Sequence, residues 1–170
     1  VVLVGVSQLL SFKGGVHPPE SKKHTEHKSI ETALVPQIVT IPLQQHIGAP
    51  CEPLVKPGDK VYMGQKIGES KGFVGAPVHS SVSGIVKAIL SFPHPVSGQG
   101  MAIQIENDGK DELDPDLEPK DINALSPAQI KDIIKECGIV GMGGAAFPTH
   151  VKLSPPPDKN IDTDKNNRQG

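Results

Sequence analysis

The residues of this sequence best suited to chemistry form a run of glycines in the stretch GIVGMGGAAFPTHVKL, at 138–153. Gly141, Gly143 and Gly144 let a backbone approach a ligand without interference from Cβ atoms, and they permit positive φ angles. Consecutive bare N–H groups in such a turn form a concave site for anions. Lys152, eleven residues after Gly141, supplies a positive charge for a phosphate. The spacing matches neither the Walker phosphate loop nor G-x-G-x-x-G, so an anion-binding loop and a purely structural turn both remain open.

Residues that bind metals or carry redox chemistry are sparse in this sequence. Cys51 and Cys137 are 86 residues apart and no C-x-x-C occurs, so we expect two reduced thiols and neither a zinc site nor an iron–sulfur site. His17, His24 and His27 lie in a polar stretch that offers no third ligand at a definite spacing. We therefore expect solvated histidines and no metal site.

The composition disfavours several classes of protein. The net charge is −2 at pH 7 and the basic residues are scattered, which disfavours nucleic acid and anionic membrane surfaces as partners. With no Trp, one Tyr and four Phe, the core must consist of Val, Ile and Leu, which favour strands. The opening VVLVGVSQLL is apolar over only ten residues, too few to span a bilayer. We expect an extended start there, and the missing initiator Met indicates a fragment.

Short alternating runs between residues 37 and 106 predict strands. The alternation is clearest in QIVTIPL, SGIVKAI and MAIQIE, and in SGIVKAI it sets Ile85 and Ile89 opposite Val86 and Ala88. Turn residues separate these runs in KPGDK, MGQ, GES and SVSG. Many short strands without a helical window predict a small sandwich or barrel.

The segment LSPAQIKDIIKECG carries the signals of a helix. Ser126 is the expected N-cap, Pro127 suits the first helical position, Gln129 completes a capping box and Gly138 ends the helix. The apolar side chains share one stripe, formed by Ile130, Ile133, Ile134 and Cys137. This stripe predicts that Cys137 is a core residue rather than a reactive thiol.

Three stretches of this sequence resemble known families. GIVGMGGAAFPTHVKL resembles the flavin-loop segment of the NADH-binding flavoprotein subunit of respiratory complex I. Together with FKGGVHPPESKKH, it resembles RnfC, the C subunit of Rnf-type ion-translocating electron-transport complexes, over about residues 11–163. EPLVKPGDKVYMGQKIGESKGFVGAPVHSSVSGIVKAI has the pattern of a barrel-sandwich hybrid, the fold of lipoyl and biotinyl carrier domains. The expected fold is mainly β: a barrel-sandwich hybrid followed by the start of an α/β NADH- and FMN-binding domain.

These signals and the resemblance together divide the chain into five predicted regions. The acidic run at 106–119 has two prolines and only Lys110 as a base, which is typical of a solvated linker, and it lacks the spacing of a calcium loop. The regions are an extended arm at 1–36, the hybrid domain at 37–106, an acidic linker at 107–122, the start of the FMN- and NADH-binding domain at 123–163 and an unassigned polar tail at 164–170.

The resemblance to RnfC also implies a function. It implies a peripheral subunit on the cytoplasmic face of the inner (cell) membrane, without a span of its own, that works with the other subunits of a membrane electron-transport complex. Such a subunit passes electrons from NADH through FMN to two 4Fe–4S clusters. Mapped onto this sequence, the cofactor-binding residues would be Gly141, Gly143, Gly144, Ala145 and Lys152. No catalytic residue and no metal ligand is assigned.

The sequence departs from the family pattern in ways that limit this implied function. The cluster cysteines are absent, and after DKNIDT the chain is polar where the family continues with an apolar strand. A glycine loop without an opposing wall leaves most of a flavin exposed. We therefore expect that this chain alone binds none of these cofactors and is inactive as an enzyme.

The alternative hypothesis is a lipoyl- or biotinyl-like carrier or docking module, with Lys71 as the modified residue. No Met or Asp/Ala neighbours flank Lys71 in GESKGFVG, which favours a plain surface lysine. His79 has no acidic partner at a fixed spacing, so we expect a polar residue at a strand end rather than a base.

Overall fold

The computed structural model describes residues 19–156, and the chain divides into two compact units after Leu34. Residues 19–34 are all exposed and contain a short 3-10 helix, η1 (Lys22–His24). His24 and His27 are therefore solvated, whereas His17 lies outside the described residues. Among residues 19–156, no three His, Cys, Asp or Glu side chains come together in a way that would hold a metal ion.

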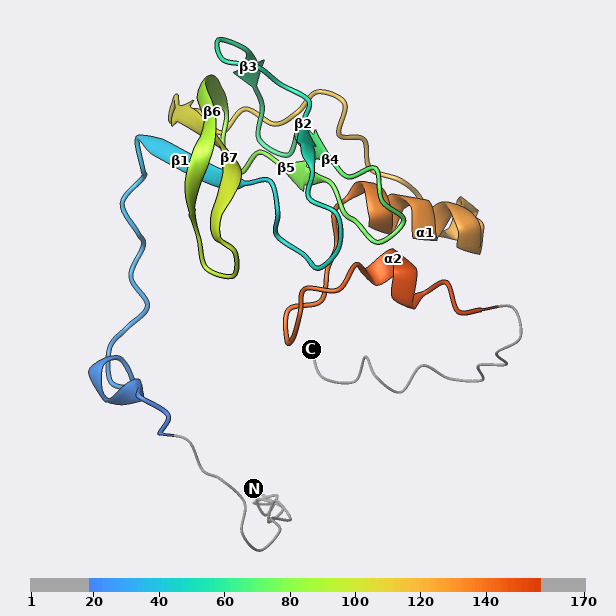
Figure 1. The fold of residues 1–170 in the computed structure, drawn as a ribbon, viewed down its shortest axis with the longest axis horizontal. Helices are drawn as coiled ribbons and strands as arrows, with labels where there is room; N and C mark the ends of the chain where they lie inside the picture. The colour runs from blue at the N-terminus through green and yellow to red at the C-terminus, as the bar shows by residue number, and fades with distance from the viewer. Residues whose placement is uncertain (1–18, 157–170) are drawn as a thin grey trace, which may run out of the picture. The chain divides into compact units, whose positions relative to one another are not determined.

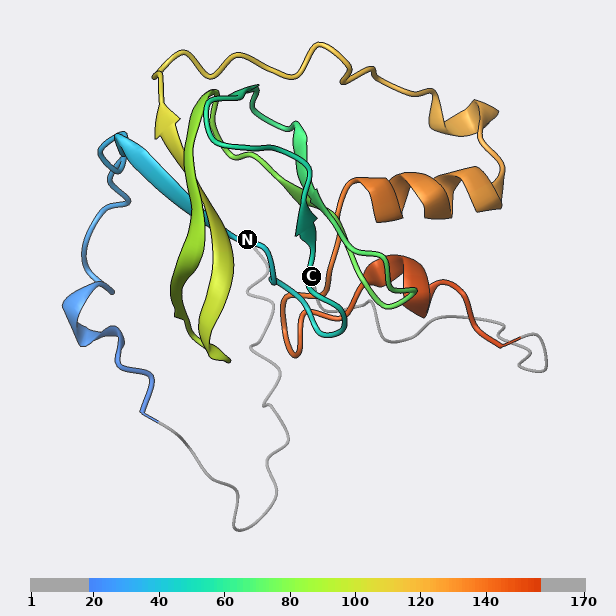
Figure 2. The ribbon, with the colours of Figure 1, turned by 45° about the horizontal axis from the view of Figure 1, so that its top comes forward.

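Two antiparallel sheets form the body of the second unit (Figure 1). The larger sheet has the strand order β1 (Ile38–Pro42), β7 (Gly98–Asn107), β6 (Gly84–His94), β3 (Lys60–Val61). The smaller sheet has the order β2 (Glu52–Pro53), β4 (Lys66–Glu69), β5 (Val78–His79). The long curved hairpin of β6 and β7 stands out in Figure 2. The predicted mainly-β architecture with many short strands is confirmed in this unit.

The core lies between the sheets and consists almost entirely of aliphatic side chains. Ile103 and Ile105 of β7 are fully buried, as are Val61 and Ile67. The alternation predicted for QIVTIPL is confirmed: Ile41 is buried within β1, whereas Ile38 is exposed. Apolar burial on one face of each strand supplies the main stabilisation of such a small domain.

The alternation predicted for SGIVKAI is wrong at one position. Ile85 is exposed and Val86 is buried, so these two lie on opposite faces as expected, but Ile89 packs against the same core as Val86. The register of β6 against β7 shifts between Val86 and Ala88. This bulge adds one residue to β6, so the odd-numbered side chains face solvent before it and the core after it.

The predicted helix is confirmed as α1 (Pro127–Glu136), with the Ser126–Gln129 capping box present and Gly138 at φ 66°. The prediction that Cys137 is a core residue is wrong, because this side chain is exposed. The apolar stripe of α1 faces an open groove beneath residues 116–125, which include the 3-10 helix η2 (Ile122–Ala124). The groove leaves the isoleucines half-buried and the cysteine at its end exposed.

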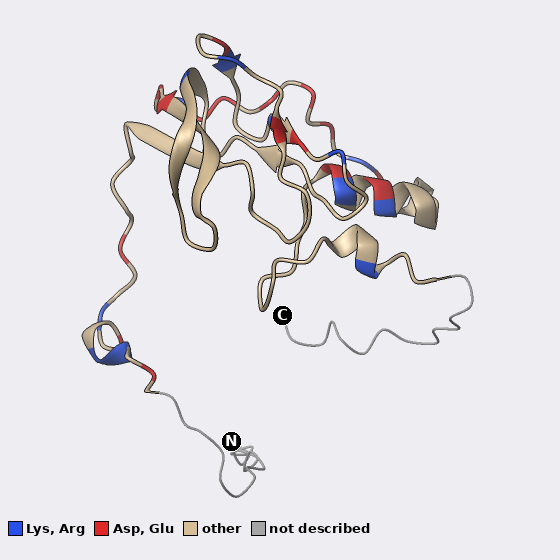
Figure 3. Cartoon of the chain, in the orientation of Figure 1, with Lys and Arg blue, Asp and Glu red and all other residues tan. Residues whose placement is uncertain are grey.

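The acidic segment after β7 runs along the surface of the unit, as the red residues of Figure 3 show. Glu112 pairs with Lys60 of β3 at 2.7 Å, and its carbonyl accepts the N–H of Met63 at 2.8 Å. The Ser83 hydroxyl donates to the Asp108 carboxylate at 2.6 Å. The start of this segment is thus fastened to the β domain while most of its side chains stay in solvent.

Candidate functional site

The glycine-rich stretch forms a closed loop directly after α1. Two backbone hydrogen bonds close its base: Gly141 N–H donates to the Phe147 carbonyl, and Thr149 N–H donates to the Ile139 carbonyl, each at 3.0 Å. We call residues 139–149 the glycine loop. The chain then enters α2 (Thr149–Lys152), which Figure 1 shows beside α1.

The tip of the glycine loop presents unused hydrogen-bond donors. Within residues 19–156, the N–H groups of Met142, Gly143, Gly144 and Ala145 donate no backbone hydrogen bond. A Cβ atom placed on Gly143 or Gly144 would meet no atom within 4 Å, so the backbone here faces open space. Four consecutive free donors are therefore available here to an anion.

Lys152 brings a positive charge to the same loop. A Cβ atom placed on Gly141 would lie 3.1 Å from the Lys152 Nζ atom, so the ammonium group rests against the loop. Of the five residues that the resemblance assigned to the cofactor, four belong to the glycine loop and the fifth, Lys152, contacts the loop at Gly141 from the following helix. Sequence spacing alone did not determine this proximity.

Ala146 was not anticipated from the sequence. Its φ of 49° places it in the left-handed region, which a residue with a Cβ atom rarely adopts. This turn redirects the chain between the exposed tip and Phe147. The glycine loop thus contains one residue, Ala146, in a conformation that its side chain does not favour.

The glycine loop and α2 contact two loops of the β domain (Figure 2). Ile47 N–H donates to the Ala145 carbonyl at 3.2 Å. His150 of α2 is 7% exposed, and its Nε2 atom lies 3.2 Å from the Phe73 carbonyl. His150 was also overlooked, although its place within the glycine-rich stretch was a usable signal.

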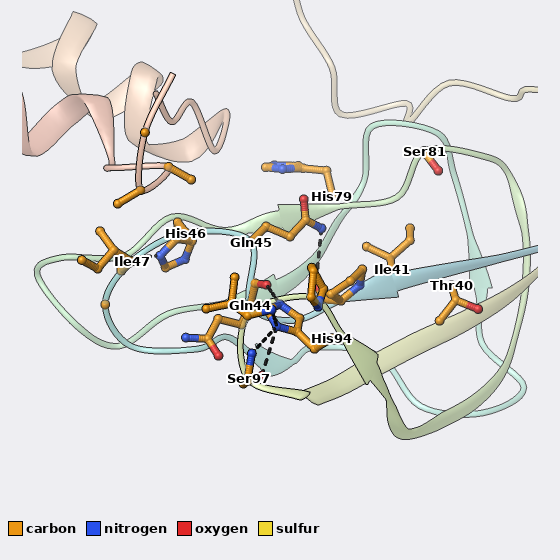
Figure 4. Close-up of a pocket in the computed structure, with 17 residues that line it drawn as sticks. Thr40, Ile41, Gln44, Gln45, His46, Ile47, His79, Ser81, His94 and Ser97 are labelled. Atoms are coloured by element: carbon orange, nitrogen blue, oxygen red, sulfur yellow. Dashed lines mark hydrogen bonds between the residues drawn. The ribbon is translucent and has the colours of Figure 1, made fainter. Parts of the chain in front are cut away.

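A cleft of about 790 Å³ lies beside this contact (Figure 4). Its walls are the end of β1, the β6–β7 turn and residues 144–146 of the glycine loop. His94 faces it but is satisfied within the fold: Nε2 donates to the Gln44 carbonyl at 2.9 Å, and Nδ1 accepts from the Ser97 backbone N–H at 3.2 Å. The neutral Nε2–H tautomer satisfies both contacts, so His94 has a structural role.

His79 also lines this cleft and sits at the end of β5, at the strand end where it was expected. Burial is the main cause that lowers the pKa of its imidazole. The ring packs against the chain at Gly138, where a Cβ atom would lie 3.3 Å from its Nδ1. The neutral form is therefore favoured near pH 7, in a role of packing.

Lys71, the candidate carrier lysine, lies in the loop between β4 and β5. Its side chain is 78% exposed and its Nζ lies 2.6 Å from the Glu52 carboxylate of β2. Modification of Lys71 stays a prediction of the alternative hypothesis.

The residues present fit one end of FMN. The phosphate of FMN requires several hydrogen-bond donors and a positive charge; the tip of the glycine loop has the free N–H groups, and Lys152 brings its charge to the base of the same loop at Gly141. The absence of Cβ atoms at Gly143 and Gly144 leaves space for the phosphate oxygens to approach the backbone. This fit concerns the phosphate end of the molecule alone.

Two families of known proteins match this chain. Residues 10–110 match the RnfC barrel sandwich hybrid domain. Residues 134–164 match the Nuo51 FMN-binding domain, and this region contains the whole glycine loop and Lys152. The first match confirms the predicted hybrid fold, and the second supports flavin as a cofactor of the family.

Individual relatives agree with these matches. The chain is 48% identical over 153 residues to the C subunit of the Na(+)-translocating ferredoxin:NAD(+) oxidoreductase complex of Acetobacterium woodii, covering 89% of this chain and 34% of the relative. It is 52% identical over 155 residues to the C subunit of the proton-translocating ferredoxin:NAD(+) oxidoreductase complex of Clostridium ljungdahlii, covering 91% and 34%. It is 41% identical over 149 residues to the C subunit of the ion-translocating oxidoreductase complex of Rhodobacter capsulatus, covering 86% and 29%.

This chain spans about a third of the length of these relatives. The family match nevertheless covers more than half of the chain, and it includes both sheets of the β domain. The resemblance predicted from the sequence is confirmed: the chain belongs to the RnfC family.

Proposed function

We propose that this chain is part of a peripheral electron-transfer subunit in a membrane-bound, ion-translocating ferredoxin:NAD oxidoreductase complex. The proposal extends to this chain what the names of its relatives state, at identities of 48% and 52%. Its partners would be the other subunits of the complex, at the cytoplasmic face of the membrane. No helix among residues 19–156 has the length and apolarity needed to cross a bilayer.

Within that subunit, the role we assign to the glycine loop is to bind the phosphate of FMN. The observation that carries this role is the run of four free N–H groups at the tip of a loop whose base, at Gly141, contacts the Lys152 ammonium. The N–H groups would donate to phosphate oxygens while Lys152 offsets their negative charge. When bound, FMN supplies hydride chemistry toward NADH and single-electron chemistry toward iron–sulfur clusters.

The 4Fe–4S clusters of this proposed path are assigned to protein outside this chain. Cys51 is buried, its thiol donates to the Ala76 carbonyl at 3.1 Å, and burial raises its pKa to about 11. Cys137 is exposed at the end of α1. Two thiols in such different surroundings do not make the four-cysteine ligand set that a cluster needs.

The test is a nuclear magnetic resonance titration of the amide groups with FMN and, separately, with riboflavin, which lacks the phosphate. FMN is expected to shift the amide signals of residues 142–145, while riboflavin leaves them unchanged. The affinity should be on the order of millimolar, because the loop forms only one wall of a ligand pocket. K152A should weaken FMN binding by about two- to fivefold, the range of one exposed charge contact.

A matched control separates local charge from net charge. K87A removes a lysine that is 50% exposed and pairs with Glu106 at 2.9 Å on the β6–β7 hairpin. This variant should bind FMN as the unaltered chain does. If riboflavin shifted the amide signals as much as FMN does, or if K87A and K152A lost the same FMN affinity, the loop would not be a phosphate site.

A further inference from the structure

We propose that two loops of the hybrid domain, residues 46–49 and 70–77, form a seat that sets the conformation of the glycine loop. In this proposal His46 and His150 are positioning residues for the ligand that the glycine loop holds. The proposal deepens the function proposed above and rests on it for the identity of the ligand. The seat itself depends only on contacts within residues 35–156.

The seat contacts the glycine loop and its flanks at three points along the chain. Before the loop, Gly138 lies so close to the Pro77 carbonyl that a Cβ atom there would be 2.5 Å from the oxygen. At the tip, the Ala145 carbonyl accepts a hydrogen bond from the seat. After the loop, His150 bonds to the second seat loop. The exposed donors of the tip are therefore bracketed on both sides by contacts with one surface.

The two seat loops are also fastened to each other. Ala49 N–H donates to the Val74 carbonyl at 3.3 Å, and the Ser70 hydroxyl donates to the Ala49 carbonyl at 3.0 Å. At Gly48, with a φ of 112°, a Cβ atom would collide with the Val74 carbonyl. This approach is closer than a side chain permits, so the two loops act as one surface.

His46 is the buried link between these loops. It is 7% exposed, its Nε2 atom accepts the Ala76 N–H at 3.1 Å, and its Nδ1 atom lies 3.0 Å from the Ile47 carbonyl. Nε2 also lies 3.0 Å from the Ala76 carbonyl, so the ring contacts both backbone polar groups of Ala76 as well as the Ile47 carbonyl. Ile47 in turn donates its own N–H to Ala145 at 3.2 Å. One chain of contacts thus runs from the second seat loop through His46 to the tip of the glycine loop.

His150 fixes the position of Lys152. α2 has only four residues, too few to hold a helical turn without tertiary contacts. The hydrogen bond from His150 Nε2 to the Phe73 carbonyl anchors this turn. The His150 and Phe73 rings also pack edge-to-face, with their centroids 6.2 Å apart. The other nitrogen, Nδ1, is buried without a partner among the described residues. The favourable polar contact of this ring is therefore the Nε2 bond, which holds Lys152 against Gly141.

The test compares H150A, H150Q and a control variant in two measurements on the whole chain. Gln retains a donor at about the reach of Nε2, so H150Q should restore what H150A loses. The control V61A removes volume from a fully buried position on β3, outside both seat loops and the glycine loop. The measurements are hydrogen exchange at the Gly141 and Thr149 amides, which needs no ligand, and the FMN titration of residues 142–145.

H150A should accelerate exchange at both amides and weaken FMN binding by about two- to tenfold, the effect of one net hydrogen bond. H150Q should approach the unaltered chain, and V61A should change neither reading. Unchanged exchange in H150A, or equal changes in V61A, would overturn the seat while leaving the phosphate site intact. If the unaltered chain shows no phosphate-dependent binding, the proposed function fails. In that case, faster amide exchange in H150A but not in V61A, restored in H150Q, would still establish the seat.

Discussion

Gly138 offers the sharpest measurement of how firmly the end of α1 is docked on the β domain. Its φ is 66°, and a Cβ atom there would lie 2.5 Å from the Pro77 carbonyl and 3.3 Å from the His79 ring. Substitution by Ala therefore brings two separate penalties. One penalty is conformational, from the positive φ, and the other is steric, from the close Pro77 carbonyl. Another glycine of the chain allows the two penalties to be separated.

Gly98 is that second glycine. Its φ is 75°, but a Cβ atom there would have nothing within 4 Å. Placing Ala in the left-handed region costs about 1–2 kcal/mol, and the reduced freedom of the unfolded chain returns about 0.4–1 kcal/mol. G98A should therefore lower the free energy of unfolding by about 1 kcal/mol. G138A adds the steric penalty of a crowded site, about 1–3 kcal/mol, for a total of about 2–4 kcal/mol.

Urea denaturation of both variants measures this difference, since the midpoint and slope give the free energy of unfolding. Hydrogen exchange locates its effect, because relief of the clash by undocking would expose the α1 amides while the sheets keep their protection. A loss in G138A no larger than that in G98A would refute the docking of α1 against Pro77. The contact between Gly138 and the seat at Pro77 would then be refuted as well.

Three further outcomes follow from individual side chains. A146G should raise the free energy of unfolding by about 0.5–1 kcal/mol in urea denaturation, because Ala146 occupies a left-handed conformation. The ion pair with Lys66 at 2.6 Å lowers the pKa of Glu136 below 4.5. The ion pair therefore stabilises the fold at pH values above the unfolded-state pKa of Glu136, and this stabilisation is lost as the pH falls through the lower pKa of the folded state. We expect it to amount to at most about 1 kcal/mol and to be absent in E136Q, measured as the free energy of unfolding against pH. A thiol reagent at pH 8 should label Cys137 and spare the buried Cys51, so C137S should remain unlabelled when the intact mass is measured.

Local signals in the sequence predicted the elements well because those elements depend on local physics. The alternation in QIVTIPL reflects which face of β1 meets the core, and the capping box at Ser126 reflects donors that the first turn of α1 leaves unpaired. Failures arose where distant parts of the chain decide the outcome. The bulge after Val86 depends on pairing with β7, and the exposure of Cys137 depends on how residues 116–125 cross the helix.

The candidate site shows the same division. The free N–H groups at Gly143 and Gly144 could be anticipated, since bare backbone is visible in the residue types alone. The contacts of His46 and His150 could not be anticipated, because their partners lie 30 and 77 residues away along the chain, although the position of His150 within the glycine-rich stretch was visible. No periodicity or short motif links residues so far apart, whereas folding brings them to one surface.

A loop made of nearly bare backbone needs such a surface for a physical reason. Each glycine loses more conformational freedom on ordering than another residue, about 0.5–1 kcal/mol relative to Ala, and the glycine loop and its flank contain four between 138 and 144. The same bareness that would admit a phosphate thus opposes the ordered conformation by about 2–4 kcal/mol, and few side chains remain within the tip to offset it. The contacts at Gly138, Ala145 and His150 come instead from loops tied to two sheets. A hybrid domain without any carrier lysine would then have a sufficient role, which is to supply the rigidity that the glycine loop cannot generate from its own sequence.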